Sequence, residues 1–202
     1  MEGLFKFLIE VGKLKDTQRT GWIVEGVKDP ESVSDHLFRT AMAVLVLGKS
    51  RKDLDLNKCL KMALIHDIAE SQIGDVLVDW KVKNHGEKMK RIGQKGIHGI
   101  TQQEKEMKER EGMEKMASFL GENGKEIFDL WNEYEQRKTK ESIFVKSVEL
   151  FEMFLQAWEY EQSQKVDISS WFEGKENWDK IKDPEVRKLI LEIVEKRKRK
   201  SC

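Results

Sequence analysis

The chain has 202 residues, a length that suits one domain with a short appendage. Lys plus Arg and Asp plus Glu both total 37, so no net charge favours a nucleic-acid polymer or a membrane surface as partner. Hydrophobic residues make up 39%, enough for one buried core, while only 2 prolines and many Lys, Glu, Leu and Met residues favour helices.

The two cysteines indicate the compartment. Cys59 and Cys202 lie far apart and form no CxxC pair, as is typical of intracellular thiols. Residues 1–3 lack the basic start of a signal peptide, and no apolar run has the length of a membrane span. We therefore expect an intracellular, cytoplasmic protein. The basic run Lys196–Lys200 resembles a nuclear-localisation signal, but such a run is more often a solvated helix end.

Apolar periodicity predicts helices in the first half of the chain over residues 4–14, 33–48 and 57–72. Residues 19–22 between the first two are predicted to form a polar turn. The segment 59–65 is apolar almost all round, so the third helix should be central and buried.

The second half of the chain begins with an irregular stretch. Residues 77–100 hold several glycines and many lysines with weak periodicity, which indicates a loop or basic insertion with at most one short helix. Further helices are predicted over 101–120, 127–134, 142–160 and 185–200. No segment has the period of a strand, so we expect a single all-α bundle over 1–202, with 161–202 as a C-terminal helical extension.

Ionisable residues interrupt the apolar helices, and a buried charge is costly unless it is paired or bound to a metal. His66, Asp67 and Glu70 directly follow the apolar run, at spacings that place neighbours on one side of a helix. Other candidates lie on the second helix, after the third helix and on the late apolar helix: His36, Asp75, Glu149 and Glu152.

Imidazole nitrogens and carboxylate oxygens from three separate helices can converge on one ion. This ligand chemistry suits a divalent metal such as Mn, Co, Fe or Zn. A metal of this kind polarises a phosphoryl group and supplies hydroxide near neutral pH. The pattern therefore favours a metal-dependent hydrolase with its site between the central helices.

The short sequence motifs around these residues are more specific than the ligands themselves. Together they resemble the motifs of the 5'-deoxynucleotidases of the HD-domain superfamily. The ligand pattern is His36, then the pair His66-Asp67, then a late acidic residue. The matching words are Arg19-Thr20-Gly21-Trp22, Pro30-Glu31-Ser32-Val33-Ser34-Asp35-His36, Ala63-Leu64-Ile65-His66-Asp67-Ile68-Ala69-Glu70, Gly74-Asp75 and Phe144-Val145-Lys146. A bare His-Asp pair would carry little weight, but this ordered set is specific.

The resemblance implies an all-helical HD-domain homodimer that hydrolyses deoxynucleoside 5'-monophosphates. It implies Mn, Co or Mg as the metal, with Zn and Fe left open. By position, the implied metal ligands are His36, His66, Asp67 and Glu149, with Glu70, Asp75 and the backbone of Val76 as possible additional ligands.

The resemblance also implies how the substrate is handled. Arg19 would hold the phosphate, because a guanidinium grips two oxygens at once. Trp22 would pack against the sugar or base. Glu70 would donate a proton, and Asp75 would orient the attacking water.

Two features depart from the family. Glu149 stands where the family has Asp, and the extra methylene would shift the metal or the helix. Family members usually have a short loop after Gly74-Asp75, whereas this chain has the insertion that contains His85 and His98.

Each candidate also has a structural interpretation. A lone His36 or His66 is more often a structural histidine, Glu70 can face solvent, Asp75 can be a turn residue, Arg19 can be a surface charge and Trp22 can be core. We expect Glu152 to form a buried ion pair with Arg39 rather than to serve the site.

Two other functions stay open at this stage. HD proteins also hydrolyse other nucleotides, and nothing in the residues fixes the base. Glu149 also leaves room for a weakly active or inactive protein that binds metal and nucleotide without turnover.

Overall fold

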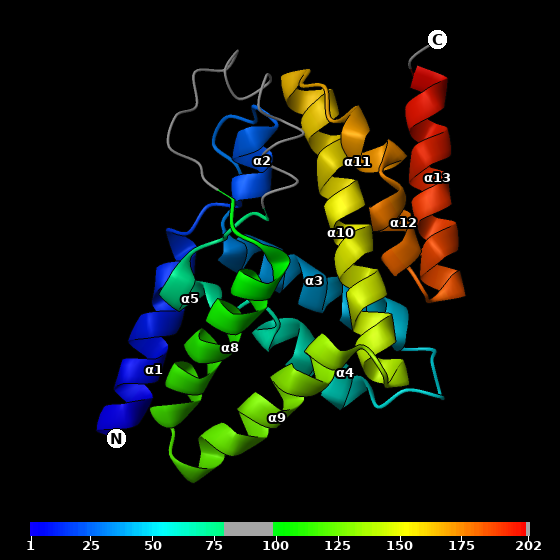
Figure 1. Ribbon diagram of the computed structural model, residues 1–202. Coiled ribbons are helices and arrows are strands. Elements are labelled where there is room, and N and C mark those ends of the chain that lie inside the picture. The colour runs from blue at the N-terminus through cyan, green and yellow to red at the C-terminus, as the bar shows by residue number, and fades with distance from the viewer. Residues whose placement is uncertain (79–98, 201–202) are drawn as a thin grey trace. The chain divides into compact units, whose positions relative to one another are not determined.

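The computed structural model describes residues 1–78 and 99–200 (Figure 1), and this part of the chain is helical without a strand. The predicted all-α class is confirmed. The chain forms two compact units, each made of two separate stretches. The first unit is 1–36 with 67–129, and the second is 37–66 with 130–202.

The first unit contains the N-terminal helices and the pair α5 and α8. Its elements are α1 (Glu2–Gly12), the 3-10 turn η1 (Lys13–Lys15), α2 (Thr20–Val24), α5 (Glu70–Ile73) and α8 (Gln102–Ser118). Helix α5 packs against α1, η1 and α8. A capping box between Thr101 and Glu104 starts α8, because each side chain satisfies a backbone N–H of the other residue.

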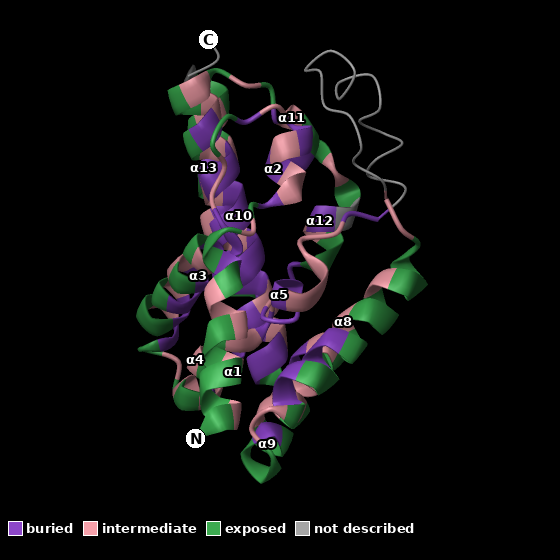
Figure 2. Cartoon of the chain, turned by 90° about the vertical axis from the view of Figure 1, so that its left-hand side faces the viewer, coloured by how far each residue is buried: buried purple, intermediate pink, exposed green. Residues whose placement is uncertain are grey.

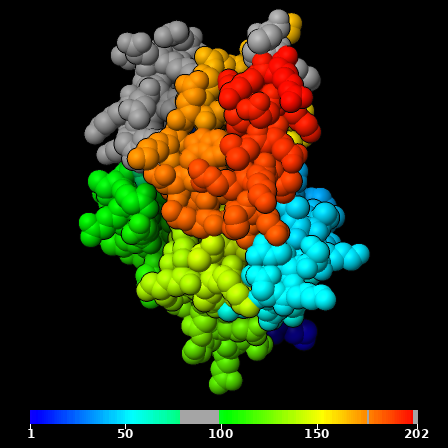
Figure 3. Space-filling model, turned by 90° about the vertical axis from the view of Figure 1, so that its right-hand side faces the viewer, coloured from blue at the N-terminus to red at the C-terminus, as the bar shows by residue number. Residues whose placement is uncertain are grey.

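The second unit is built around one long apolar helix. Its own elements are α4 (Leu56–Ile65), α10 (Lys140–Gln164), α11 (Ser169–Glu173), α12 (Lys175–Lys180) and α13 (Pro184–Lys200). Helix α10 packs against α4, α11, α12 and α13, and buried positions recur along its length (Figure 2). Helices α11 to α13 lie together on one face of this unit (Figure 3), where Arg187 covers the ring of Trp178.

Two helices belong to both units. α3 (Val33–Gly48) leaves the first unit after His36, and α9 (Glu122–Gln136) leaves it after Asp129. The predicted helices over 33–48, 101–120, 127–134, 142–160 and 185–200 are confirmed, with ends that differ by a few residues.

The predicted helix over 57–72 is wrong beyond Ile65, where a turn over residues 66–69 separates α4 from α5. The His66 ring Nδ1 lies 2.9 Å from the carbonyl oxygen of Ala63, the acceptor that a continuing helix needs for residue 67. The backbone then closes with i to i+3 bonds, such as Glu70 N–H to the Asp67 carbonyl at 3.0 Å.

The predicted polar turn at 19–22 is also wrong, because residues 20–24 form α2. The Asp75 carboxylate accepts the backbone N–H of Thr20 at 2.7 Å, and the Asp75 carbonyl accepts its hydroxyl at 2.6 Å. A partner 55 residues away satisfies the start of this helix, so no local pattern predicts it.

The predicted insertion over 77–100 lies mostly outside the described residues, as do His85 and His98 within it. Its described ends meet: the N–H of Ile100 donates to the carbonyl of Leu77 at 3.0 Å, and Val78 and Ile100 form an isolated parallel bridge. Within the described part of the chain, no helix combines the length and hydropathy that a membrane crossing requires.

Candidate metal and phosphate site

His36 is placed by the capped start of α3. Asp35 accepts hydrogen bonds from the backbone N–H of Ser32 at 2.9 Å and from the Ser32 hydroxyl at 2.7 Å. The Ser32 hydroxyl in turn accepts the N–H of Asp35 at 3.2 Å. This reciprocal cap fixes the first turn of the helix, and the His36 ring that follows is fully buried.

His66 is oriented by the turn that ends α4. Because a carbonyl only accepts hydrogen bonds, the contact with Ala63 requires the proton on Nδ1 and leaves the lone pair on Nε2. The Trp131 indole donates to the backbone carbonyl of His66 at 3.2 Å, which helps to hold the turn. The imidazole therefore presents Nε2 as a possible metal ligand, an arrangement usual for metal-binding histidines.

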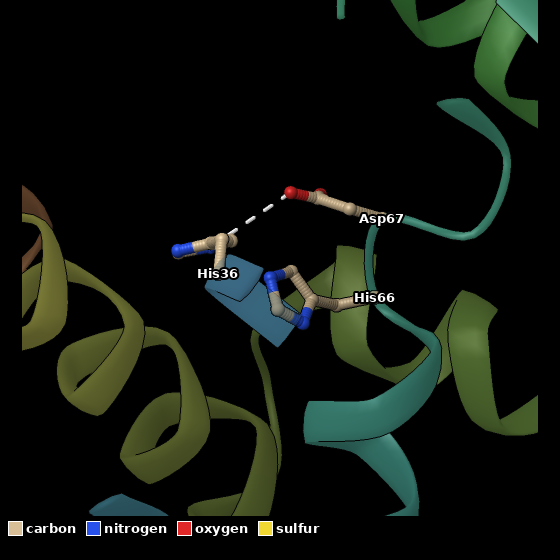
Figure 4. A group of neighbouring side chains, drawn as sticks. All are labelled: His36, His66 and Asp67. Carbon is tan, nitrogen blue, oxygen red and sulfur yellow. Dashed lines mark ion pairs between the residues drawn. The ribbon is translucent and has the colours of Figure 1, made fainter. Parts of the chain in front are cut away.

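His36, His66 and Asp67 form a group whose ligand atoms all lie within 4.8 Å of one another (Figure 4). The dashed contact joins His36 Nε2 and Asp67 Oδ2 at 3.9 Å, too long for a hydrogen bond. Ligands about 2 Å from a shared ion lie at such separations from each other. Two imidazoles and a carboxylate, mostly buried, therefore fit a divalent cation.

Arg19 is surrounded by acidic side chains. Its Nη1 lies 3.0 Å from Asp67 Oδ2 and 3.7 Å from Glu70 Oε1, and its Nε lies 3.9 Å from Asp75 Oδ2. Burial by itself would lower the pKa of Arg19, but attraction by Asp75, Glu70 and Asp67 raises it above the ordinary value. The guanidinium therefore stays charged beside the group of Figure 4.

Glu70 is the buried acid of this site, with 3% of its surface exposed. Within the described part of the chain its Oε2 has no hydrogen-bond partner. Burial, followed by repulsion from Asp67 and Asp75, raises the pKa of Glu70, and Arg19 and Lys105 only partly oppose this rise. Because the side chain is buried, the solvent-facing interpretation of Glu70 is wrong.

Asp75 is directed toward Arg19 and Thr20 by the backbone that ends α5. Gly74 has φ +75°, a conformation that a side chain would strain. Asp75 follows it and binds the first turn of α2, so it links the Arg19 segment to the segment that carries Glu70. The half-buried Val76 comes next in the chain.

Trp22 lies in the core, and its indole N–H donates to Glu31 Oε1 at 2.9 Å. The Glu31 carbonyl also accepts the N–H of Arg19 at 3.0 Å. Trp22 thus braces the segment that carries Arg19. The contact of Trp22 with a sugar or base stays a prediction.

Glu149, in the second unit, is held by its own neighbours. Its carboxylate accepts a hydrogen bond from the Tyr134 hydroxyl and lies 2.7 Å from the Lys146 ammonium through either oxygen. It does not belong to the groups of metal-compatible side chains found among the described residues. Its role as the fourth ligand stays a prediction.

The predicted ion pair between Glu152 and Arg39 is confirmed. Arg39 Nη2 lies 2.6 Å from Glu152 Oε1, and Glu152 is 1% exposed. Arg39 also binds Glu159 at 2.7 Å and the side-chain oxygen of Gln156. These contacts join α3 to α10 within the second unit.

One charged residue near the site was not predicted. Lys105 on α8 interacts electrostatically with Glu70, Asp75 and Asp67. In the sequence it is one lysine of a charge-rich helix, and only its position on the partly buried face distinguishes it.

Comparison with known proteins relates the chain to one family. A model described as HD domain matches residues 11–187. A Dictyostelium discoideum protein named 5'-deoxynucleotidase HDDC2 is 38% identical over 98% of this chain and 100% of its own length. The Homo sapiens protein of that name is 34% identical over 96% of this chain and 86% of its own length. A solved structure, titled a conserved hypothetical protein from Pyrococcus furiosus, is similar with a TM-score of 0.67 and 28% identity over 95% of this chain and 99% of that one.

Proposed function

This chain belongs to the HD-domain family, and on that premise we propose that it is a metal-dependent 5'-deoxynucleotidase. It would convert deoxynucleoside 5'-monophosphates to deoxynucleosides and phosphate, the activity named for its relatives. The observation that carries the proposal is the group His36, His66 and Asp67 beside the charged Arg19. A cation site next to a guanidinium suits a phosphate monoester, which carries two negative charges.

The metal would be held by His36, His66 and Asp67, and we propose Mn, Co or Mg as the ion. When bound, the ion lowers the pKa of water and stabilises charge on the phosphate. Glu70, Asp75 and the Val76 carbonyl stay possible additional ligands.

Arg19 binds and orients the phosphate. Its guanidinium already lies 3.0 Å from Asp67, so a phosphate bound there is held beside the ligand group. The positive charge of Arg19 also stabilises the negative charge that builds up on the phosphate oxygens as the bond to the sugar breaks.

Glu70 and Asp75 move the protons. The attacking water donates a hydrogen bond to Asp75, which takes one of its protons as the water oxygen forms the new bond to phosphorus. The bond between phosphorus and the 5'-oxygen breaks, and the leaving oxygen takes the proton of Glu70. The raised pKa of Glu70 supports this role, because the acid must be protonated before transfer.

A nucleotide panel tests the proposed function. With Mn²⁺ or Co²⁺, the purified chain should release phosphate from dAMP, dGMP, dCMP or dTMP, and EDTA should stop the reaction. The matching ribonucleoside monophosphates should react at least tenfold more slowly. Equal turnover of ribonucleotides would reject the deoxy specificity, preference for triphosphates or cyclic nucleotides would indicate another HD hydrolase, and binding without turnover would indicate an inactive relative.

The fourth-ligand role of Glu149 predicts a pair of opposite results. Glu149→Asp should keep activity within about tenfold of the wild type, since the charge remains on a shorter side chain. Glu149→Gln should weaken Mn²⁺ binding about 10–100-fold, because a neutral amide is a poor ligand. Calorimetric titration with Mn²⁺ checks both variants. Unchanged Mn²⁺ affinity in Glu149→Gln would show that Glu149 is not a metal ligand.

We also propose that the chain forms a homodimer through α3. Four large apolar side chains are exposed on this helix at helical spacing: Phe38, Met42, Leu45 and Val46. Arg39, the charged neighbour of this stripe, is bound by Glu152 on α10. Exposed apolar residues at this spacing favour a protein interface, and an uncharged stripe can pair with its own copy about a twofold axis.

Val46→Asp tests the α3 interface. In a twofold interface the new charge appears twice, so dimerisation should weaken more than tenfold. Sedimentation at micromolar concentration measures this, with Leu191→Asp on α13 as the control, because Leu191 is also exposed. A dimer unaffected by Val46→Asp, or a monomeric wild type, contradicts the proposal.

The cytoplasmic location expected from the sequence stays a prediction.

A further inference from the structure

Lys105 lies on the inward face of α8, in the first unit. Lys105 and Glu109 are half-buried, Gly112, Met113 and Met116 are buried, and residues 102–108 other than Lys105 are exposed. Positions three or four apart share one side of a helix. Lys105 therefore begins the same face that is buried two turns later.

This face of α8 packs against the segment that carries Glu70. Helices α5 and α8 are in contact, and a side-chain carbon added to Gly112 would meet the Ala69 carbonyl oxygen at 3.2 Å. Further along, the Ser71 hydroxyl lies 3.5 Å from the Met116 sulfur. Since Ala69 and Ser71 flank Glu70, the start of this face directs Lys105 toward the acidic site.

The environment of Lys105 agrees with this direction. Its ammonium lies 3.3 Å from Glu109, and 24% of its side chain is exposed. Burial by itself would lower the pKa of Lys105, but attraction by Glu109, Glu70, Asp75 and Asp67 raises it above the ordinary value. The ammonium therefore remains charged and is attracted by the carboxylates of Glu70, Asp75 and Asp67.

Without its metal, the site carries more negative than positive charge. Asp67, Glu70 and Asp75 surround Arg19. With Glu70 carrying the proton that the proposed mechanism requires, the two remaining carboxylates and the guanidinium sum to −1. Lys105 adds a second cation, whose charge is shared with Glu109 at 3.3 Å.

We propose that Lys105 is a positioning residue whose ammonium offsets part of the charge of Asp67 and Asp75, so that the phosphate of the substrate binds more tightly beside Arg19. This inference rests on the proposed function for its substrate, a phosphate monoester. The ammonium of Lys105 should strengthen binding of the phosphate anion and weaken binding of the metal cation.

These opposite effects define the experiment. Lys105→Met removes the charge and keeps most of the length, so phosphate binding should weaken about tenfold, the effect of one charge at several ångströms in a partly solvated site. Mn²⁺ binding to the metal-free protein should stay the same or become tighter. Lys105→Arg should restore phosphate binding, and Lys108→Met, an exposed lysine of the same helix, should change neither affinity.

Calorimetry with inorganic phosphate and, separately, with Mn²⁺ gives both affinities without turnover, and KM for dAMP gives a third measure. A phosphate affinity within twofold of the wild type in Lys105→Met overturns the proposal. So does weaker binding of phosphate and Mn²⁺ together, because that result indicates a structural role. If the wild type turns over no deoxynucleotide, the proposed function fails, while the two binding titrations still decide the role of Lys105.

Discussion

Replacing Asp67 by asparagine is expected to lower kcat/KM for a deoxynucleoside monophosphate on the order of 10³-fold. Asp67 lies 3.9 Å from His36, its neighbour in the proposed cation site, and 3.0 Å from Arg19, the residue proposed to bind the phosphate. A bound metal contributes several kcal/mol to phosphoryl transfer, and each 1.4 kcal/mol is about a tenfold change in rate. Steady-state phosphate release measures the loss of activity, and Mn²⁺ titration of the same preparation measures the loss of metal affinity.

The Asp67→Asn variant should lose metal affinity while it stays folded, because the amide keeps the shape of the carboxylate. Asp129→Asn is the matched control, since Asp129 is an exposed aspartate paired with Lys125 on its own helix. A variant that binds Mn²⁺ as tightly as the wild type, or retains more than a tenth of its activity, contradicts the assignment of Asp67.

Replacing Glu70 by glutamine should stabilise the metal-free protein at neutral pH while it lowers kcat about 10²–10⁴-fold, the usual contribution of a proton donor. Burial and the neighbouring carboxylates raise the pKa of Glu70 from 4.5. Protonated Glu70 contributes fully to the free energy of unfolding below pH 4.5, the ordinary pKa of the group. This contribution is lost as the pH rises through the raised pKa of the folded state. Glutamine carries no charge at any pH in this range, so the variant does not lose stability in this way.

The advantage of Glu70→Gln should therefore grow with pH in the window above 4.5. The slope is at most about 1.4 kcal/mol per pH unit, or about 3–5 °C in Tm for a chain of this size. Thermal unfolding in EDTA from acid to mildly alkaline pH measures it, with the exposed Glu106→Gln as the control. A Tm difference that is constant with pH, or that shrinks as the pH rises, contradicts the raised pKa.

The helices could be predicted where apolar residues recur in the sequence at helical spacing. Apolar residues recur at helical spacing along the 25 residues of α10, so its periodicity survives local irregularities. The end of α4 could not be predicted, because it depends on a histidine ring that takes a backbone carbonyl from the helix. α11 and α12 have five and six residues, too few to show a period.

Part of the candidate site could also be predicted. The sequence motifs around His36 and His66 identified the candidate metal ligands that the structure brings together. The surroundings of Arg19 could not be predicted, since Asp67 and Asp75 reach it from positions about 50 residues further along. Lys105 remained hidden because only the packing of α8 on α5 separates it from the surface lysines of the same helix.

In the proposed site, one cation is shared by the imidazoles of His36 and His66 and the carboxylate of Asp67. Pulsed electron paramagnetic resonance of bound Mn²⁺ tests it directly, because nitrogen nuclei that ligate the ion modulate its signal. The wild type should show two imidazole nitrogens, and His36→Ala and His66→Ala should each lose one. Bound Mn²⁺ without imidazole nitrogen coupling would contradict this account of the site.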